Sequence, residues 1–226
     1  PHRVQARPAL IARARGAELL LCTGADLEEG WLPLLLRRSR NPDVQPGSPG
    51  HLLAADQVTL KDVPASLDRA DGHVHPRGNP HVHTDPRNIA RVAEVLGTRL
   101  MEIDPAHAEH YRARLESFRE RWGEAVRAWE RRAGPLAGHR VLVHHREWIY
   151  LLDWLGMERV GSLEPKPGLP PGPGHLAELQ RLQAQRPADL LIRAPTDDFR
   201  AAEWMAERTG IRVVTLPYTV GADEAA

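Results

Sequence analysis

Short apolar runs alternate with amphipathic segments along most of the chain, and their lengths predict strands and helices in turn. Residues 18–22, Glu-Leu-Leu-Leu-Cys, form a continuous apolar run followed by Thr23-Gly24, which is typical of a buried parallel strand that ends at a loop. A second short strand is predicted around Val58 and Leu60. Apolar spacing and the position of Pro8 predict helices at 7–16 and 28–39.

The middle of the chain contains the clearest periodic pattern. Between residues 105 and 133 the large apolar side chains recur every three or four positions, and the remaining positions are mostly Arg, Glu and Ala. This pattern predicts one long amphipathic helix of about seven turns, ended by Gly134-Pro135. The apolar positions are Tyr111, Leu115, Phe118, Trp122, Val126 and Trp129.

A second alternating block follows the long helix. Strands are predicted at 140–143, 160–163, 189–193 and 213–216, and helices at 148–155, 175–185 and 199–209. Strands that alternate with helices imply parallel sheets. The predicted fold class is therefore α/β, with an N-terminal α/β lobe (1–104), a linking long helix (105–134) and a C-terminal α/β lobe (135–226). Ligands of parallel sheets bind outside the carboxyl ends of the strands, so we expect the site in the cleft between the lobes.

Composition excludes several classes of protein. Lys plus Arg and Asp plus Glu number 30 each, and this zero balance argues against a nucleic-acid binder. No apolar run approaches the roughly 18 residues of a membrane span. The single cysteine, Cys22, lies in an apolar run and is interpreted as a buried thiol. The chain opens at Pro1-His2 without an initiator Met, which we interpret as a processed or incomplete N-terminus.

Histidine is the residue that suggests chemistry. The chain has 12 histidines, and neutral imidazole is a common zinc ligand. Four of them, His73, His75, His81 and His83, lie in the Pro/Gly-rich stretch 71–88, where Asp85-Pro86 is predicted to begin a helix over 89–100. In an extended segment, the i, i+2 spacing would place each pair on one side. Exposed loop histidines without a role are the alternative interpretation.

Two further histidines, at positions 144 and 145, follow the predicted strand 140–143. Because adjacent residues of a strand point to opposite faces, at most one of them would face a cleft. The chain contains neither a helical HExxH motif nor a Cys-x-x-Cys pair, which excludes zincin and zinc-finger sites.

Three segments carry a resemblance to a known family. Asn79-Pro80-His81-Val82-His83-Thr84-Asp85-Pro86 resembles the NPHxWxDP stretch of the solute-binding proteins of bacterial zinc and manganese ABC importers. The strand that ends at His145, followed by an aromatic-rich helix to Gly156, resembles that family's third ligand segment. The opening Pro1-His2, with the helix and strand up to Gly24, resembles its first. The resemblance covers the whole chain.

The resemblance implies a metal site and a role. The ligands would be His2, His81 and His145, with His145 preferred to His144 because its distance from Gly156 fits the family pattern. Three imidazoles favour zinc over manganese, whose sites contain more carboxylates. Zinc would be captured in the periplasm, or by a lipid-anchored extracytoplasmic protein, and delivered to an ABC importer permease. The protein would be a monomer, bound to the membrane only through the permease, and not an enzyme.

The sequence departs from the family pattern at the fourth ligand. The family supplies a carboxylate after its last strand, whereas this chain has Leu216-Pro217-Tyr218-Thr219 there. Candidates for a substitute are Glu164, Asp197 and Asp198, or the position is open to water. His83 stands where the family often has an aromatic residue, and His73 and His75 are either a weak collecting loop or, for His75, a true ligand.

Two other functions remain open from the sequence. Three His ligands with an open fourth position also form a catalytic zinc site, which would make the protein a zinc-dependent hydrolase with Glu164 or Asp85 as general base. A module that binds a small organic ligand, with incidental histidines, is the second. For any zinc site made of imidazoles, we expect affinity to fall below about pH 6–6.5.

Overall fold

The computed structural model describes residues 4–64, 75–217 and 219. These residues form two compact units. The first contains the described residues up to Val63 together with His75–Trp129, and the second contains Pro64 and the described residues from Glu130 onward. The boundary between Trp129 and Glu130 lies inside the longest helix, α4 (Ala108–Ala133), so both units share this helix.

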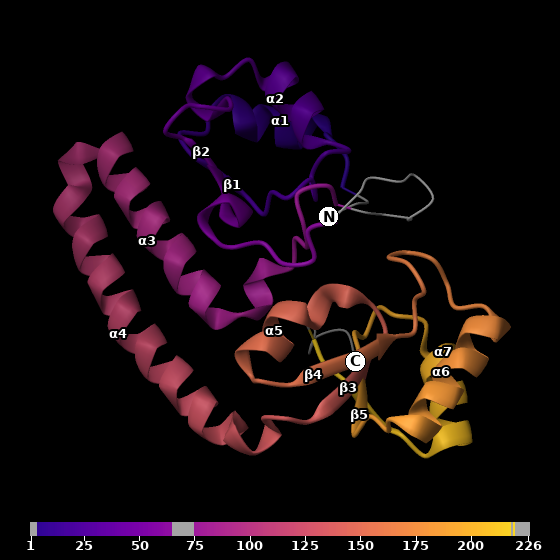
Figure 1. Ribbon diagram of the computed structural model, residues 1–226. Coiled ribbons are helices and arrows are strands. Elements are labelled where there is room, and N and C mark those ends of the chain that lie inside the picture. Colours follow the sequence, from indigo (N-terminus) through magenta and orange to yellow (C-terminus); the bar gives the residue numbers. More distant parts are fainter. Residues whose placement is uncertain (1–3, 65–74, 218, 220–226) are drawn as a thin grey trace. The chain divides into compact units, whose positions relative to one another are not determined.

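The first unit is built around a small parallel sheet. Strand β1 (Leu20–Cys22) pairs with β2 (His51–Leu53), and Leu21 lies opposite Leu52. Helices α1 (Pro8–Arg15) and α2 (Leu32–Ser39) pack together beside this sheet (Figure 1). Their shared core is made of Ala14, Cys22, Leu32, Leu35, Leu36 and Val44. Cys22 is buried, as predicted, and burial raises the pKa of its thiol to about 12.

The second strand of this unit differs from the prediction. The structure has no strand at Val58 and Leu60; β2 lies earlier, directly after Gly50. A Cβ atom on Gly50 would lie 2.2 Å from the carbonyl oxygen of Glu18 and 2.3 Å from that of Asp43. Close backbone approach therefore fixes where the chain joins β1. Only three residues of β2 pair with β1 before a 3-10 turn begins (Ala54–Gln57). A strand of this length is too short to show a clear alternation of apolar and polar residues in the sequence.

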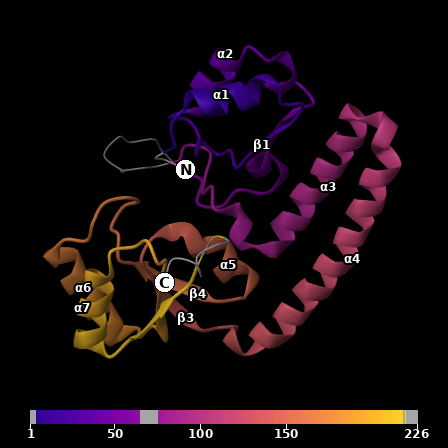
Figure 2. The ribbon, with the colours of Figure 1, turned by 180° about the vertical axis from the view of Figure 1, so that it is seen from behind.

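Two long helices complete the first unit. Helix α3 (Pro86–Ile103) begins as predicted, with Asp85 as the capping residue: its Oδ1 accepts a hydrogen bond from the Arg87 N–H at 2.8 Å. Helix α4 then runs back beside α3, and Figures 1 and 2 show the pair as a hairpin. Trp122 of α4 connects the two helices, because its Nε1–H donates a hydrogen bond to the carbonyl of Pro86 in α3 at 2.8 Å. The predicted long helix is confirmed.

The second unit is a four-stranded parallel sheet with helices on both faces. The strand order is β4 (Glu158–Ser162), β3 (Arg140–Val143), β5 (Leu190–Arg193) and β6 (Arg212–Thr215). Helices α6 (Pro173–Gln185) and α7 (Phe199–Thr209) pack together on a core with Leu142 and Leu191 (Figure 1). Helix α5 (Ile149–Trp154) packs on a separate core with Val141, Val143 and Ile192. The α/β prediction with parallel sheets is confirmed.

The carboxyl ends of the four parallel strands lie at the same edge of this sheet. At β3 the strand order changes direction. From β3 the chain adds β4 on one side, and then β5 and β6 on the other. Ligands of such sheets bind outside the carboxyl ends at this reversal point. The residues that follow β3, His144 and His145, therefore stand where the topology favours a site.

Candidate metal centre

The two histidines after β3 have different surroundings. His144 continues the sheet, because its N–H donates to the Ile192 carbonyl at 2.8 Å, and its side chain is buried with 5% exposed. His145 has left the ladder and precedes a 3-10 turn (Arg146–Trp148), and 27% of its side chain is exposed. Of the pair, His145 is the more exposed, and it is also the residue that the resemblance implies as a ligand.

One ring nitrogen of His145 is already engaged. Its Nδ1 lies 2.6 Å from Oε2 of Glu164, which follows β4, the strand paired with β3. A carboxylate only accepts, so Nδ1 carries the proton and donates it. The neutral ring then presents its lone pair at Nε2. A carboxylate behind a histidine in this way fixes the tautomer and the ring orientation of metal-binding imidazoles.

The electrostatics of this edge favour a cation. Burial alone would lower the pKa of His145, but the hydrogen bond to Glu164 and the charges of Glu147, Glu164 and Asp197 outweigh it, and the pKa is raised. Burial would raise the pKa of Glu164, but its hydrogen bonds from His145 and Gly168 keep the pKa below its usual value. Burial raises the pKa of Glu147 to about 7. Acidic groups thus surround His145, and a bound cation would compensate them.

His81 in the first unit has an equivalent arrangement. Its Nδ1 lies 2.9 Å from Oδ1 of Asn79, and its backbone N–H donates to the same oxygen at 3.0 Å. An amide oxygen also accepts only, so Nδ1 donates and Nε2 keeps its lone pair. The segment is fastened to α3 by Asn88, whose Nδ2 donates to the Val82 carbonyl at 2.9 Å. His81 is therefore held in one orientation as a nitrogen ligand.

The remaining loop histidines are placed less favourably. Residues 82–84 form a short 3-10 turn, so the segment is not extended, and the i, i+2 argument for same-side presentation does not apply to His81 and His83. The two rings lie 6.3 Å apart between centroids and are tilted by 50°. His83 is exposed and His75 is half-buried. His2 and His73 lie outside the described residues.

The acidic candidates for a fourth ligand have roles of their own. Asp198 caps α7 and forms an ion pair with Arg200. Asp197 accepts from the Ala194 N–H at 2.7 Å. Glu164 accepts from His145 and from the Gly168 N–H at 2.8 Å. Among the residues that the structure describes, no group of three or more His, Cys, Asp or Glu side chains is placed to hold a metal ion.

Sequence reasoning missed the two residues that orient the histidines. In the sequence, Asn79 was considered only as part of the motif around His81. The signal for its role is its spacing, because the side chain of an Asn can accept a hydrogen bond from the backbone N–H two residues later, as in an Asx turn. Glu164 was considered as a ligand. The predicted topology contained the signal that it orients His145, because residues at the carboxyl ends of two adjacent parallel strands lie side by side.

These features define a class before any comparison: an α/β protein whose two units share a long helix and each present an oriented imidazole. The family of the zinc-uptake complex component A, periplasmic (ZnuA), matches residues 1–226, and the chain belongs to this family. The predicted resemblance, the class of metal-importer solute-binding protein and the periplasmic location are thereby confirmed. Within the described part of the chain, no helix is both long and apolar enough to cross a membrane.

Two curated relatives show how widely the family varies. The high-affinity zinc uptake system protein ZnuA of Yersinia pestis is 23% identical over 239 residues, which covers 96% of this chain and 72% of that protein. The manganese-binding lipoprotein MntA of Halalkalibacterium halodurans is 26% identical over 167 residues, 73% of this chain and 50% of that protein. Their names agree on a transition metal and differ on which one.

Solved structures agree on the fold. The crystal structure of ZnuA matches with a TM-score of 0.76 at 20% identity, covering 99% of this chain and 80% of that chain. The solute-binding protein FpvC of Pseudomonas aeruginosa in complex with nickel matches with a TM-score of 0.71 at 19% identity, covering 96% and 74%. At these identities the likeness shows the shared architecture and no detail of the site.

Proposed function

We propose that this protein captures zinc as cargo through His2, His81 and His145 and delivers it to an ABC importer permease. The observation that carries the proposal is shared by His81 and His145. Each has Nδ1 hydrogen-bonded to an oxygen acceptor, Asn79 or Glu164, which leaves Nε2 as the lone-pair nitrogen. Metal-binding histidines are prepared in this way. Two of the three proposed ligands are thus oriented without metal.

The choice of zinc rests on the chemistry of the donors. A set of three neutral imidazoles suits zinc better than manganese, which prefers harder oxygen ligands. Glu164 is occupied by two hydrogen bonds, so its role in this proposal is to orient His145, and the fourth position is open to water. The negative edge around His145 supplies charge compensation without adding a carboxylate to the ligand set.

The proposal assigns the ligands to two lobes. His2 and His81 belong to the lobe proposed at residues 1–104, His145 to the lobe at 135–226, and the long helix joins them. The metal is carried and released, so the protein acts as a monomeric binding protein, peripheral to the membrane through its permease, and not as a hydrolase. We expect the zinc-loaded protein to cleave neither ester nor phosphate substrates.

The test is a calorimetric zinc titration of metal-stripped protein beside three variants. We expect one tight site per chain, lost in His81→Ala and in His145→Ala. His107→Ala is the matched control, because His107 is an exposed histidine that pairs with Asp104 on the α3–α4 turn. Tight binding that survives both ligand substitutions would refute the proposed ligand set. A titration with manganese that binds more tightly than zinc would refute the choice of metal.

A further inference from the structure

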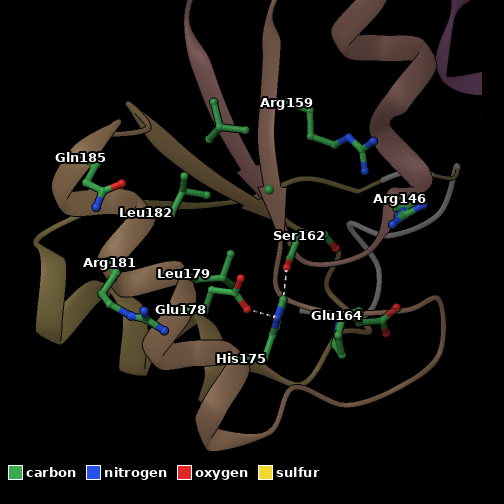
Figure 3. A pocket seen from close by; sticks show the side chains of 13 residues that line it. Arg146, Arg159, Ser162, Glu164, His175, Glu178, Leu179, Arg181, Leu182 and Gln185 are labelled. Carbon is green, nitrogen blue, oxygen red and sulfur yellow. Dashed lines mark hydrogen bonds and ion pairs between the residues drawn. The ribbon is translucent and has the colours of Figure 1, made fainter.

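One carboxylate oxygen connects the proposed metal ligand to a surface loop. Oε2 of Glu164 accepts two hydrogen bonds, from Nδ1 of His145 at 2.6 Å and from the backbone N–H of Gly168 at 2.8 Å. The side chain of Glu164 is only 15% exposed, and Figure 3 shows it after the end of β4, among the residues that line a cavity of about 510 Å³. The position of this oxygen therefore depends on both partners.

The loop that supplies the second hydrogen bond has little conformational freedom. Residues 165–172 contain four prolines, each of which fixes its own φ and restricts the preceding residue. Gly168 has a φ of +78°, and the Leu169 N–H closes a turn onto the Lys166 carbonyl at 3.0 Å. Beyond the loop, Nε2 of His175 donates to the Ser162 carbonyl at 3.0 Å (Figure 3). The loop thus presents the Gly168 N–H from a nearly fixed position.

We propose that Gly168 is a positioning residue for metal capture: its backbone N–H holds Glu164, and Glu164 holds the imidazole of His145. This inference rests on the proposed function, since it names how one of the proposed ligands is kept in place. Coupling between two sites is reciprocal in free energy. A metal on Nε2 that fixes the His145 ring must therefore also stabilise the hydrogen bond from Gly168, and with it the conformation of residues 165–172.

Through this coupling, metal binding would change the order of an exposed loop. The loop tip is exposed, with Leu169 at 49%, and the tip residue adjoins Gly168 directly. A partner that contacts Leu169 would contact a segment whose order depends on whether cargo is bound. The connection described here runs through two hydrogen bonds, and a single substitution at Glu164 or Gly168 removes or displaces one of them.

The first test compares two glycines of the same loop. Gly168→Ala places a side chain where φ is +78°, which L residues adopt only with strain, and this shifts the N–H away from Glu164. Gly172→Ala is the control, because its φ is −85° and an added Cβ meets nothing within 4 Å. We expect zinc affinity to fall about 3- to 10-fold in Gly168→Ala, less than the 10- to 100-fold typical of losing an orienting carboxylate. We expect Gly172→Ala to match wild type.

The second test measures the reverse direction of the coupling. In wild type, we expect zinc to slow hydrogen exchange of the Gly168 amide, and Glu164→Gln to abolish this slowing and shift the visible spectrum of the cobalt-loaded protein. A purely structural role of the loop would change stability without either effect. An unchanged affinity in Gly168→Ala, or an unchanged exchange rate of the Gly168 amide, would overturn the inference. Zinc binding that needs His145 but ignores Gly168 would leave the proposed function standing, whereas absence of zinc binding in wild type would overturn both.

Discussion

Two properties of His145 affect zinc binding in opposite directions. Its hydrogen bond to Glu164 orients it for a metal, and the same acidic surroundings raise its pKa above 6.5, so a proton competes for Nε2 over a wider range of pH than at a free histidine. Zinc affinity should therefore fall as the pH drops through this raised pKa. In Glu164→Gln, whose amide lacks the charge, the fall should begin at a lower pH. Competition titrations between pH 5.5 and 8.5 would show this, and coincident profiles would contradict it.

The stability of the metal-free protein should change with pH in the opposite direction. A raised pKa in the folded state stabilises the protein below the unfolded pKa, and this contribution is lost as pH rises through the folded pKa. For Glu147 that window runs from about 4.5 to about 7, and for His145 it lies above 6.5. We expect the unfolding free energy to fall between pH 5 and 8, and Glu147→Gln to remove roughly 1–3 kcal/mol of that fall. Urea unfolding with chelator present measures it; equal slopes for both proteins would contradict the assignment.

The candidate histidines follow from the sequence, whereas the groups that orient their rings do not. His81 and His145 were implied by motifs that are local in sequence. Glu164 lies 19 positions after His145 and meets it only because β3 and β4 pair in parallel. Orientation of a side chain depends on such contacts, and these depend on register, which apolar patterning specifies only to within a few residues.

In the helix pair α3 and α4, replacing a glycine by alanine is expected to change stability in opposite directions at two positions. A Cβ on Gly97 of α3 would lie 2.8 Å from Cδ2 and 3.3 Å from Cγ of Leu115 in α4, so the Leu115 side chain would have to move out of its present position. On Gly123 of α4 it would meet only the flexible end of Arg127, at 3.3 Å. The two positions therefore provide a matched pair for the packing of the hairpin.

Alanine gains helix propensity at both positions but creates strain at only one. We expect Gly123→Ala to raise the unfolding free energy by roughly 0.5–1 kcal/mol. Gly97→Ala should lower it by about 1 kcal/mol, because overpacking outweighs the same gain. Urea or thermal unfolding compares them directly. A stabilised Gly97→Ala variant would show that Leu115 repacks freely and that the two helices are not in tight contact there.

Most elements could be predicted because their signals were long or strongly marked. Helix α4 repeats its apolar spacing over seven turns, and α3 begins at an Asp-Pro pair that serves as cap and first residue. Strand β2 could not, because its three residues include a histidine, and its place is set by the close approach of Gly50 to two carbonyl oxygens. Short elements are fixed by tertiary contacts, which periodicity does not contain.

At the scale of the whole molecule, the proposed ligands come from both compact units. His81 belongs to the first unit and His145 to the second. A ligand that binds only the folded state stabilises whatever must be folded to bind it, by an amount that grows with its concentration relative to Kd. Zinc held by both histidines should therefore stabilise both units, whereas zinc held by one unit should stabilise that unit alone.

Hydrogen exchange at one reporter in each unit tests this difference. The Thr84 amide donates to the His81 carbonyl at 3.2 Å, and the Leu163 amide donates to the Val143 carbonyl at 2.8 Å. Zinc should slow exchange at both in wild type, because opening either region would require release of the metal. In His145→Ala it should slow neither, although Thr84 lies in the other unit. If zinc still protects Thr84 in His145→Ala, the first unit holds the metal without the second, which would move the site to the histidines of its own loop.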